Sequence, residues 1–280
     1  MRSSLTRLAI GVLAVGLLAG CGPKDSPVAE QPTPSATPTP TPTPSPTPTG
    51  PPEDGLVRNS IYAAGEVAEV KCALPTTKLA NQQAVIGYAA AFVGCLNKAW
   101  EPVLEKADKV FVPAKVVPAV VGTKSPCDEI RATSAAHYCS SDSSIYLKWS
   151  SSVENQASAQ EDAREELQFV IAGLYGYHVQ SAAGVEEPYA KRYATATSAA
   201  AKLLESKRYQ IQARCFAAAF YGANQKSLAL DKGFIIYYGT FGFAKDKKND
   251  GQQNSWLAKG WLGKSANACN TWAASPKQIS

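Results

Sequence analysis

The sequence predicts a helix-rich α+β fold with a small early β-sheet. Helical spacing of apolar residues dominates the second half of the chain, and short β-branched and aromatic segments lie before residue 150. Prolines are concentrated near the start, since 12 of the 19 fall between Pro23 and Pro52. We therefore expect one folded region, residues 60–280, behind an extended N-terminal part.

Residues 1–20 have the pattern of a lipoprotein signal peptide. Arg2 and Arg7 precede an apolar run, Leu8 to Ala19, that is too short to span a bilayer. The run leads into Leu18-Ala19-Gly20-Cys21, which resembles a lipobox, so Cys21 is the expected lipidation site. A diacylglyceryl group plus an N-terminal acyl chain such as palmitate would anchor the protein stably on the outer face of the cell membrane. An ordinary secretory signal with an incidental cysteine is the alternative.

Residues 21–59 are expected to form a disordered stalk. Proline and threonine alternate from Thr37 to Thr49, and such a repeat forms neither a helix nor a packed core. It favours extended polyproline II at ~3.1 Å per residue, so about thirty residues would reach ~90 Å. The stalk would hold the folded domain away from the membrane.

Charge argues against a nucleic-acid partner. The formal net charge is +5, and without Arg2 and Arg7 there remain 26 basic against 23 acidic residues, a net charge of +3. Nucleic-acid binders carry a dense basic stripe instead. The one mixed basic run, Lys245 to Asp250, contains two aspartates and is typical of a solvated loop.

Six cysteines remain after Cys21 and predict three disulfides in an oxidising compartment. Six cysteines permit fifteen pairings. Proximity in the sequence favours the first two pairs and elimination gives the third: Cys72–Cys95, Cys127–Cys139 and Cys215–Cys269. A cysteine-rich metal site is the competing interpretation, which the absence of any CxxC spacing disfavours.

The elements of the folded domain follow from local patterns. An extended piece is predicted at Val67–Cys72 and a helix at Ala84–Lys98, then strands at Val110–Pro113 and Ile145–Trp149. Ser158 and Glu161 form a capping box that opens a long helix ending at Gly184. Further helices are predicted at residues 191–221, 228–238 and 256–262.

Four segments, in order, resemble the bacterial neutral zinc metallopeptidases, a zincin-like family. Residues 169–180, F-V-I-A-G-L-Y-G-Y-H-V-Q, resemble its V-I-A-H-E-V-G-H-H-V-Q signature, and residues 210–217, Q-I-Q-A-R-C-F-A, resemble its E-L-Q-A-D-C-F-A helix. Residues 137–147 resemble its cysteine-bracketed turn and strand. The closing pieces around Trp256 and Cys269 also match. The lipobox and stalk resemble actinobacterial versions of the family.

The resemblance implies a zinc site whose ligands this chain has replaced. In HExxH the two histidines lie at i and i+4 on one helical face, and the glutamate activates the zinc-bound water. The first ligand position is Gly173, the general base is Leu174 and the second ligand is Tyr177. The third ligand, a glutamate in the family, is Gln210, and the family's nearby aspartate is Arg214. We therefore expect no metal, no cofactor and no catalytic residue, with Tyr177, Gln210 and Arg214 bonding one another.

The two histidines offer little for a replacement site. His178 matches the extra histidine after the second ligand, which points about 100° from the metal face, so we expect it to be partly buried and hydrogen-bonded. His137 is expected to be exposed or packed on the first strand. An alternative metal site would need both, with carboxylates such as Asp142, Glu165 or Glu166.

The favoured function is binding without cleavage. Ile145–Trp149 resembles the cleft-edge strand of zincins, and strand addition needs only backbone groups, so extended peptides or cell-envelope proteins are the expected partners. The expected peptide contacts are Ile145, Tyr146, Leu147 and His178. One alternative is an active zinc endopeptidase with non-standard ligands; another is a structural protein whose cleft its own side chains fill.

Overall fold

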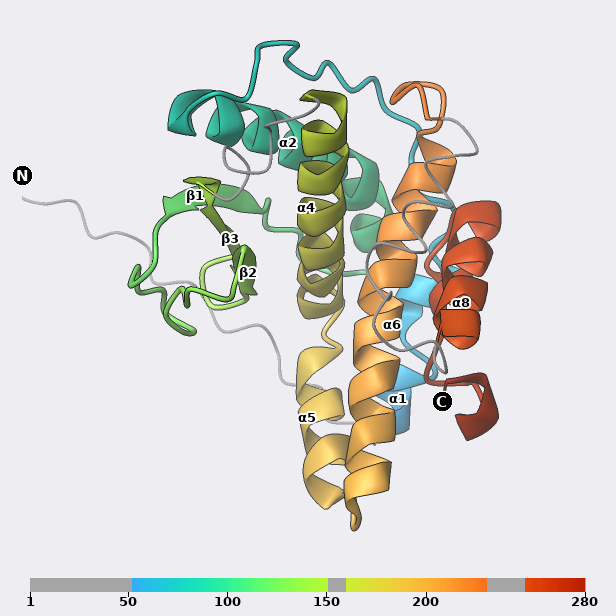
Figure 1. Ribbon diagram of the computed structural model, residues 1–280. Helices are drawn as coiled ribbons and strands as arrows, with labels where there is room; N and C mark the ends of the chain where they lie inside the picture. Colours follow the sequence, from blue (N-terminus) through green and yellow to red (C-terminus); the bar gives the residue numbers. More distant parts are fainter. Residues whose placement is uncertain (1–51, 151–159, 231–249, 280) are drawn as a thin grey trace, which may run out of the picture. The chain divides into compact units, whose positions relative to one another are not determined.

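A computed structural model describes residues 52–150, 160–230 and 250–279 (Figure 1). The signal peptide, Cys21, the Pro/Thr repeat, the Ser158 capping box and most of the predicted helix at 228–238 lie outside these ranges. The α+β class is confirmed. The elements are α1 (Pro52–Leu56), η1 (Ser60–Ala63), α2 (Gln82–Lys106), β1 (Lys115–Ala119), β2 (Ala136–Cys139), β3 (Ser144–Lys148), α4 (Gln160–Ala182), α5 (Glu186–Thr195), α6 (Ala199–Ala223), α8 (Asp250–Gly263), η3 (Asn267–Cys269) and η4 (Pro276–Gln278).

The sheet and α6 pack on opposite sides of α4. β2 and β3 contact α4 and β1 contacts α2, whereas α6 packs against the other side of α4 and α8 packs on α6 (Figure 1). The contact between α4 and α6 needs a glycine, because a Cβ atom on Gly176 would overlap the backbone carbonyl of Ala213. The two helices that carry the positions of the family's metal-binding residues therefore cross with their backbones in direct contact.

The predicted helices at Ala84–Lys98, Ser158–Gly184 and 256–262 are confirmed within α2, α4 and α8. The helical region predicted over 191–221 is confirmed, although it is divided between α5 and α6. Ala196 leaves α5 with extended backbone angles, and the Ser198 side chain caps α6 by accepting from the N–H of Ala201 at 3.1 Å. Residues 228–230 do not continue α6 either, since Ala229 has a φ of 52°.

The strand predicted at Val110–Pro113 is also wrong, since the first strand begins at Lys115. Pro113 has no N–H to donate. The side chain of Asn97 then occupies both backbone groups of Ala114, with its Oδ1 accepting and its Nδ2 donating at 3.0 Å each. Backbone pairing with another strand therefore begins one residue later, at Lys115.

The sheet has the order β1-β3-β2, so β3 is its central strand. β1 pairs with β3 in parallel and β2 pairs with β3 antiparallel, with Tyr138 opposite Ile145. The prediction that Ile145–Trp149 forms a cleft edge is wrong, because residues 136–139 occupy the edge that a peptide would need. Ile145, Tyr146 and Leu147 are buried, so they are not peptide contacts.

The folded region begins before residue 60, which corrects the predicted extent of the stalk. Leu56, at the end of α1, is fully buried, and α1 packs on α5. The side-chain amide of Asn59 donates to the carbonyls of Gly55 at 2.8 Å and Ala183 at 3.0 Å. Residues 52–59 therefore belong to the folded region.

Two of the three predicted disulfides are confirmed. Cys127–Cys139 joins the turn before β2 to its last residue, and Cys215–Cys269 joins α6 to η3. The Cys72–Cys95 bond is not formed, so this prediction is wrong for the structure. The two side chains remain thiols that hydrogen-bond each other, and this bond lowers the pKa of Cys95. The two side chains are thus close enough for a hydrogen bond but are not joined by a disulfide.

No helix in the described ranges is both long enough and apolar enough to cross a membrane.

Candidate functional site

The site predicted from the sequence lies on one face of α4. Gly173, Tyr177 and Ser181 recur at four-residue intervals, so they share that face. Among the residues that the structure describes, no heavy atom beyond the adjacent backbone of α4 lies within 4 Å of the position that a Cβ on Gly173 would take. Tyr177 is half-buried one turn later. The position of the family's first ligand is therefore open space with no side chain.

The facing residues come from α6. Burial raises the pKa of Tyr177, and the positive charge of Arg214 acts in the opposite direction. The structure thus brings Tyr177 and Arg214 together. Gln210, however, is exposed, and the part of the expected network that has support is the electrostatic interaction of Arg214 with Tyr177.

These residues do not fit a zinc ion. Catalytic zinc takes three protein ligands, usually histidine or a carboxylate. Gly173 has no donor, Tyr177 has a phenol that burial keeps protonated, and Gln210 offers a neutral amide. Leu174, at the position of the general base, cannot accept a proton. Within the described ranges, no three His, Cys, Asp or Glu side chains are grouped so as to hold a metal ion.

His178 faces the sheet rather than this open face. It is 2% exposed, and its Nδ1 lies 3.0 Å from the hydroxyl of Tyr138 on β2. The rings of Phe111, Tyr138 and Tyr175 surround it at 6.2, 5.5 and 5.0 Å between centroids. Burial lowers its pKa from 6.5 to about 4. The predicted buried histidine is confirmed, whereas its role as a peptide contact is wrong because its ring is enclosed.

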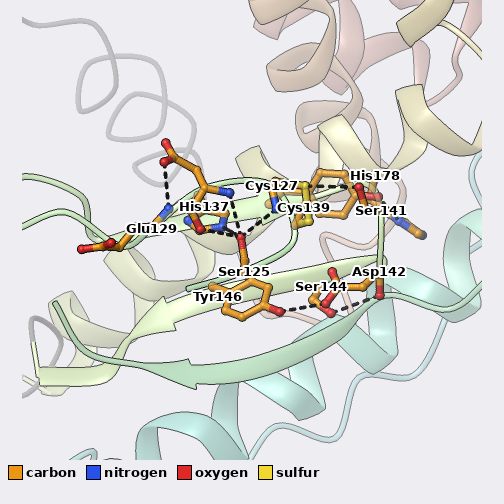
Figure 2. Close-up of a disulfide and its surroundings, with 12 residues drawn as sticks. Ser125, Cys127, Glu129, His137, Cys139, Ser141, Asp142, Ser144, Tyr146 and His178 are labelled. Atoms are coloured by element: carbon orange, nitrogen blue, oxygen red, sulfur yellow. Dashed lines mark hydrogen bonds between the residues drawn. A yellow bond between two sulfur atoms is a disulfide. The ribbon is translucent and has the colours of Figure 1, made fainter. Parts of the chain in front are cut away.

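The other histidine belongs to the disulfide-bracketed turn (Figure 2). The Nε2 of His137 lies 2.8 Å from the hydroxyl of Ser125, and its ring stacks on Tyr146 at 5.2 Å. The hydroxyl of Tyr146 donates to Asp142 at 2.8 Å. His137 thus packs on β3 rather than on the first strand. It is separate from the environment of His178, and the alternative metal site using both is not assembled here.

A row of aromatic rings that the sequence did not predict lies beside Tyr177. Tyr177 and Tyr209 lie 5.3 Å apart, Tyr209 and Tyr189 stack in parallel at 4.3 Å, and Tyr189 lies 6.0 Å from Trp272. The rings come from α4, α6, α5 and the C-terminal segment. No local spacing in the sequence marks them, because each element contributes only one or two.

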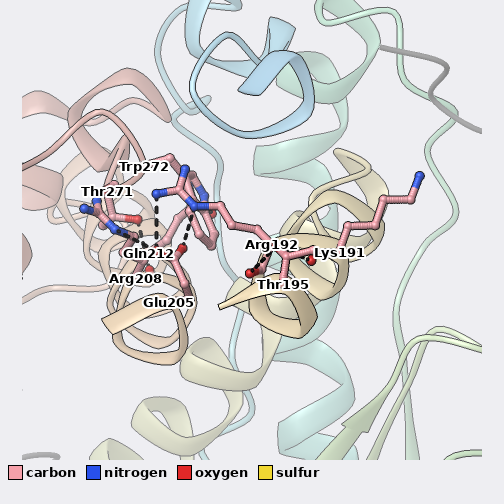
Figure 3. A network of polar contacts seen from close by, with 8 residues as sticks. All are labelled: Lys191, Arg192, Thr195, Glu205, Arg208, Gln212, Thr271 and Trp272. Carbon is pink, nitrogen blue, oxygen red and sulfur yellow. Dashed lines mark hydrogen bonds and ion pairs between the residues drawn. The ribbon is translucent and has the colours of Figure 1, made fainter. Parts of the chain in front are cut away.

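A polar network includes Trp272, the last ring of this row (Figure 3). Glu205 pairs with Arg192 at 2.8 Å, and Arg208 donates to the backbone carbonyl of Thr271. The indole N–H of Trp272 donates to Oε1 of Gln212 at 3.0 Å. Glu205 and Arg192 pair with each other, and the bond from Trp272 to Gln212 fixes the orientation of the indole ring.

Glu186 starts α5 and is half-buried. Burial raises its pKa, and the hydroxyl groups of Ser140, Ser181 and Tyr209 act to lower it. The next residue, Glu187, is also partly exposed and pairs with Lys191 at 2.7 Å. In the sequence both look like ordinary acidic residues of a first helical turn, which is why Glu186 was missed.

The outer edge of β2 has free backbone groups. Lys148 donates to the carbonyl of Ala135 at 2.9 Å, and hydrogen-bonded pairs alternate along an antiparallel ladder. Ala136 and Tyr138 therefore direct their N–H and C=O groups away from β3. No backbone bond to these outward groups is formed among the described residues. β2, rather than β3, is the strand to which a peptide can add.

Comparison with known proteins supports the resemblance in the sequence. Residues 63–236 match the protein family described as "Putative neutral zinc metallopeptidase". Two curated proteins, each named uncharacterized protein YpfJ and found in Escherichia coli strains K12 and O6:H1 (CFT073), are 25% identical over 153 residues. That match covers 55% of this chain and 53% of each relative, so the chain spans about half the length of the curated relatives it matches. No solved structure matches the chain.

Proposed function

Because the chain belongs to the neutral zinc metallopeptidase family but has replaced the metal-binding residues, we propose that it is a catalytically inactive member that binds peptides without cleaving them. One observation carries the proposal. In the described ranges no side chain fills the first ligand position, Gly173, and neither Tyr177 nor Gln210 supplies a replacement donor set. No zinc and no other cofactor is expected.

The chemistry that hydrolyses a peptide in this family depends on the missing groups. Zinc polarises the scissile carbonyl, and a carboxylate takes the proton of the attacking water. Leu174 can accept no proton, and Arg214 would repel a dication at the same site. A bound peptide would therefore be held in its ground state and released unchanged.

Binding would use the outer edge of β2. An extended peptide that adds to an exposed edge gains main-chain hydrogen bonds without requiring particular side chains. Ala136 and Tyr138 supply two outward pairs of N–H and C=O groups. The expected ligand is an extended segment of a cell-envelope protein, because the predicted lipid anchor at Cys21 would keep the domain on the outer face of the membrane.

The first experiment measures zinc in the purified full chain by mass spectrometry, before and after incubation with excess Zn²⁺ and desalting. We expect less than a tenth of an equivalent to be retained, together with saturable peptide binding and no cleavage products. One tightly held equivalent with peptide cleavage would overturn the proposal and favour an active endopeptidase with other ligands.

A further inference from the structure

We propose that β1 and the residues on either side of it form a docking surface for an anionic lipid bilayer. The surface, which we call the β1 edge, consists of four exposed valines and the lysines among them: Val110, Val112, Val120 and Val121, with Lys109, Lys115 and Lys124. It lies at the opposite edge of the sheet from β2, so it is distinct from the proposed peptide site. The predicted anchor at Cys21 serves only to bring the domain to the bilayer.

The four valines are exposed to an extent that is uncommon for aliphatic side chains. Their exposed fractions are 77% for Val110, 52% for Val112, 53% for Val120 and 56% for Val121. Apolar side chains that are exposed singly need no explanation, whereas apolar side chains gathered on one surface mark contacts with a membrane or a protein. The other exposed large hydrophobic residues of the described ranges lie elsewhere in the sequence: Tyr193, Leu203 and Leu262.

The local structure holds these valines outward. The ring of Phe111 packs toward His178, with 6.2 Å between centroids, so the valines on either side of Phe111 face away from the core. At the other end of β1, the N–H of Thr123 donates to the carbonyl of Val120 at 3.0 Å, and the N–H of Val120 donates to Oγ1 of Thr123 at 3.0 Å. Gly122, with a φ of 88°, completes this turn. The exposed valines are therefore displayed by ordered backbone.

The charge of the β1 edge is complementary to anionic lipid. Residues 109–124 contain three lysines and no acidic residue, a net charge of +3. Lys115 and Lys124 are exposed, and none of the three lysines is in an ion pair with another described residue. The nearest acidic residues along the chain are Asp108 before this segment and Asp128 after it. Lysines beside an anionic lipid surface are attracted to it, and the attraction is weakened by salt.

The β1 edge suits a bilayer better than another polypeptide. The N–H of Lys115 donates toward β3, so alternation places Pro118 on the outer side of β1, where it has no N–H to offer an added strand. The two pairs of valines lie at opposite ends of β1, up to ~26 Å apart at ~3.3 Å per residue. A protein interface has a continuous core that is depleted in lysine. A flat bilayer can instead take up separate valines while lysine ammonium groups stay among the lipid phosphates.

Docking through the β1 edge would leave the proposed peptide site accessible. β1 and β2 are the outer strands of the sheet, with β3 between them (Figure 1), so their backbones are separated by about 10 Å. A tethered domain has a high effective concentration at the membrane, so a weak docking surface is sufficient. The bilayer would then cover β1, and β2 would remain free to pair with an extended peptide.

The test reconstitutes the full chain into vesicles and measures the reactivity of its lysines. One set of vesicles contains phosphatidylglycerol and phosphatidylcholine in equal parts, and the other contains phosphatidylcholine alone. A membrane-impermeant acetylating reagent labels exposed lysines, and peptide mass spectrometry gives the rate at each position. Lys277, which is exposed outside the β1 edge, is the internal reference. Relative to it, we expect Lys115 and Lys124 to react about fivefold more slowly on the anionic vesicles, and high salt should abolish the difference.

Matched variants assign this protection to the β1 edge. Val112→Ser combined with Val121→Ser keeps every lysine but removes two apolar contacts, so most of the protection of Lys115 and Lys124 should be lost. Leu262→Ser is the control, because Leu262 is 79% exposed outside this surface and its substitution should leave the protection unchanged. Lys124→Gln keeps all four valines and should reduce the protection measured at Lys115. Circular dichroism checks the fold of each variant.

Equal labelling on the two kinds of vesicle would overturn the proposal, as would protection that the combined valine variant leaves intact. A full chain that does not float with vesicles of either composition would overturn it as well. Protection that appears in detergent without lipid and increases with protein concentration would identify a second copy of the chain, rather than a bilayer, as the occupant. None of these measurements involves a peptide, so the proposed peptide binding stands or fails separately.

Discussion

Gly176 of α4 lies so close to Ala213 of α6 that a Cβ atom on the glycine would overlap the alanine's backbone carbonyl. We therefore predict that Gly176→Ala separates the two helices and unfolds or strongly destabilises the domain. Gly173, one turn earlier on the same helix, has no atom within 4 Å of a Cβ position.

Gly173→Ala is thus the matched control. Glycine inside a helix costs about 0.5–1 kcal/mol relative to alanine, so this variant should unfold at an equal or higher urea concentration than the unmodified chain. Urea denaturation followed by circular dichroism compares the two. Equal stability of both variants would mean that α4 and α6 do not cross at Gly176.

His178 should make the domain sensitive to mild acid. Its pKa is lowered from 6.5 to about 4, so between these pH values the unfolded chain binds a proton that the native chain excludes. The histidine's contribution is constant above pH 6.5 and becomes unfavourable as the pH falls, by roughly 3 kcal/mol at pH 4.

The measurement is urea denaturation of the unmodified chain and of His178→Gln at pH 7 and pH 4.5. Glutamine can still accept a hydrogen bond from Tyr138 but does not titrate. The variant should therefore lose less stability between the two pH values. Glu186 acts with the opposite sign, since its raised pKa favours the native state in acid, and an unchanged pH slope in His178→Gln would contradict the assignment to His178.

Thiol chemistry should distinguish the three cysteine pairs. The structure has disulfides at Cys127–Cys139 and Cys215–Cys269 and thiols at Cys72 and Cys95. Alkylation of the chain in denaturant without reductant should therefore label Cys72 and Cys95, as located by peptide mass spectrometry, apart from any label on a Cys21 that carries no lipid. No label on Cys72 and Cys95 would show that these two thiols are oxidised to a third disulfide in the isolated protein.

The outer edge of β2 can be tested with proline. Ala136 directs its N–H away from β3, so Ala136→Pro removes no bond of the sheet, and proline is tolerated on an edge strand at such a position. This variant should stay folded and lose most peptide affinity in calorimetry. His137→Pro is the contrasting variant, because the N–H of His137 points to β3 and its loss should lower the unfolding midpoint. Undiminished peptide affinity in Ala136→Pro would exclude this edge as the binding surface.

Helices could be predicted from the sequence because they depend on local patterns of residues. The strand order could not, because it depends on pairing between distant segments. The helices α2, α4 and α8 followed from apolar spacing within each segment. The four-residue strand β2 gave no such signal beside its turn, and without it β3 was placed at the edge. The face of Gly173 and Tyr177 was predictable because one helix carries both residues, whereas Tyr189 and Tyr209 stack only because α5 and α6 fold together.

Rebuilding the metal-binding residues tests whether the open face of α4 is the family's zinc position. The combined variant restores two histidine ligands at i and i+4, a glutamate as the third ligand and a second glutamate as the general base. Its substitutions are Gly173→His, Leu174→Glu, Tyr177→His, Gln210→Glu and Arg214→Asp. The open space at Gly173 leaves room for the new imidazole.

We expect the rebuilt chain to retain about one equivalent of zinc after desalting, measured by mass spectrometry. Gly173→His with Tyr177→His alone is the control and should retain much less, because Gln210 supplies no carboxylate and Arg214 repels the dication. Circular dichroism must show the native helix content in both. A folded rebuilt chain that binds no zinc would mean that α4 and α6 do not present these five positions to one point, and the argument from lost ligands to lost catalysis would no longer hold.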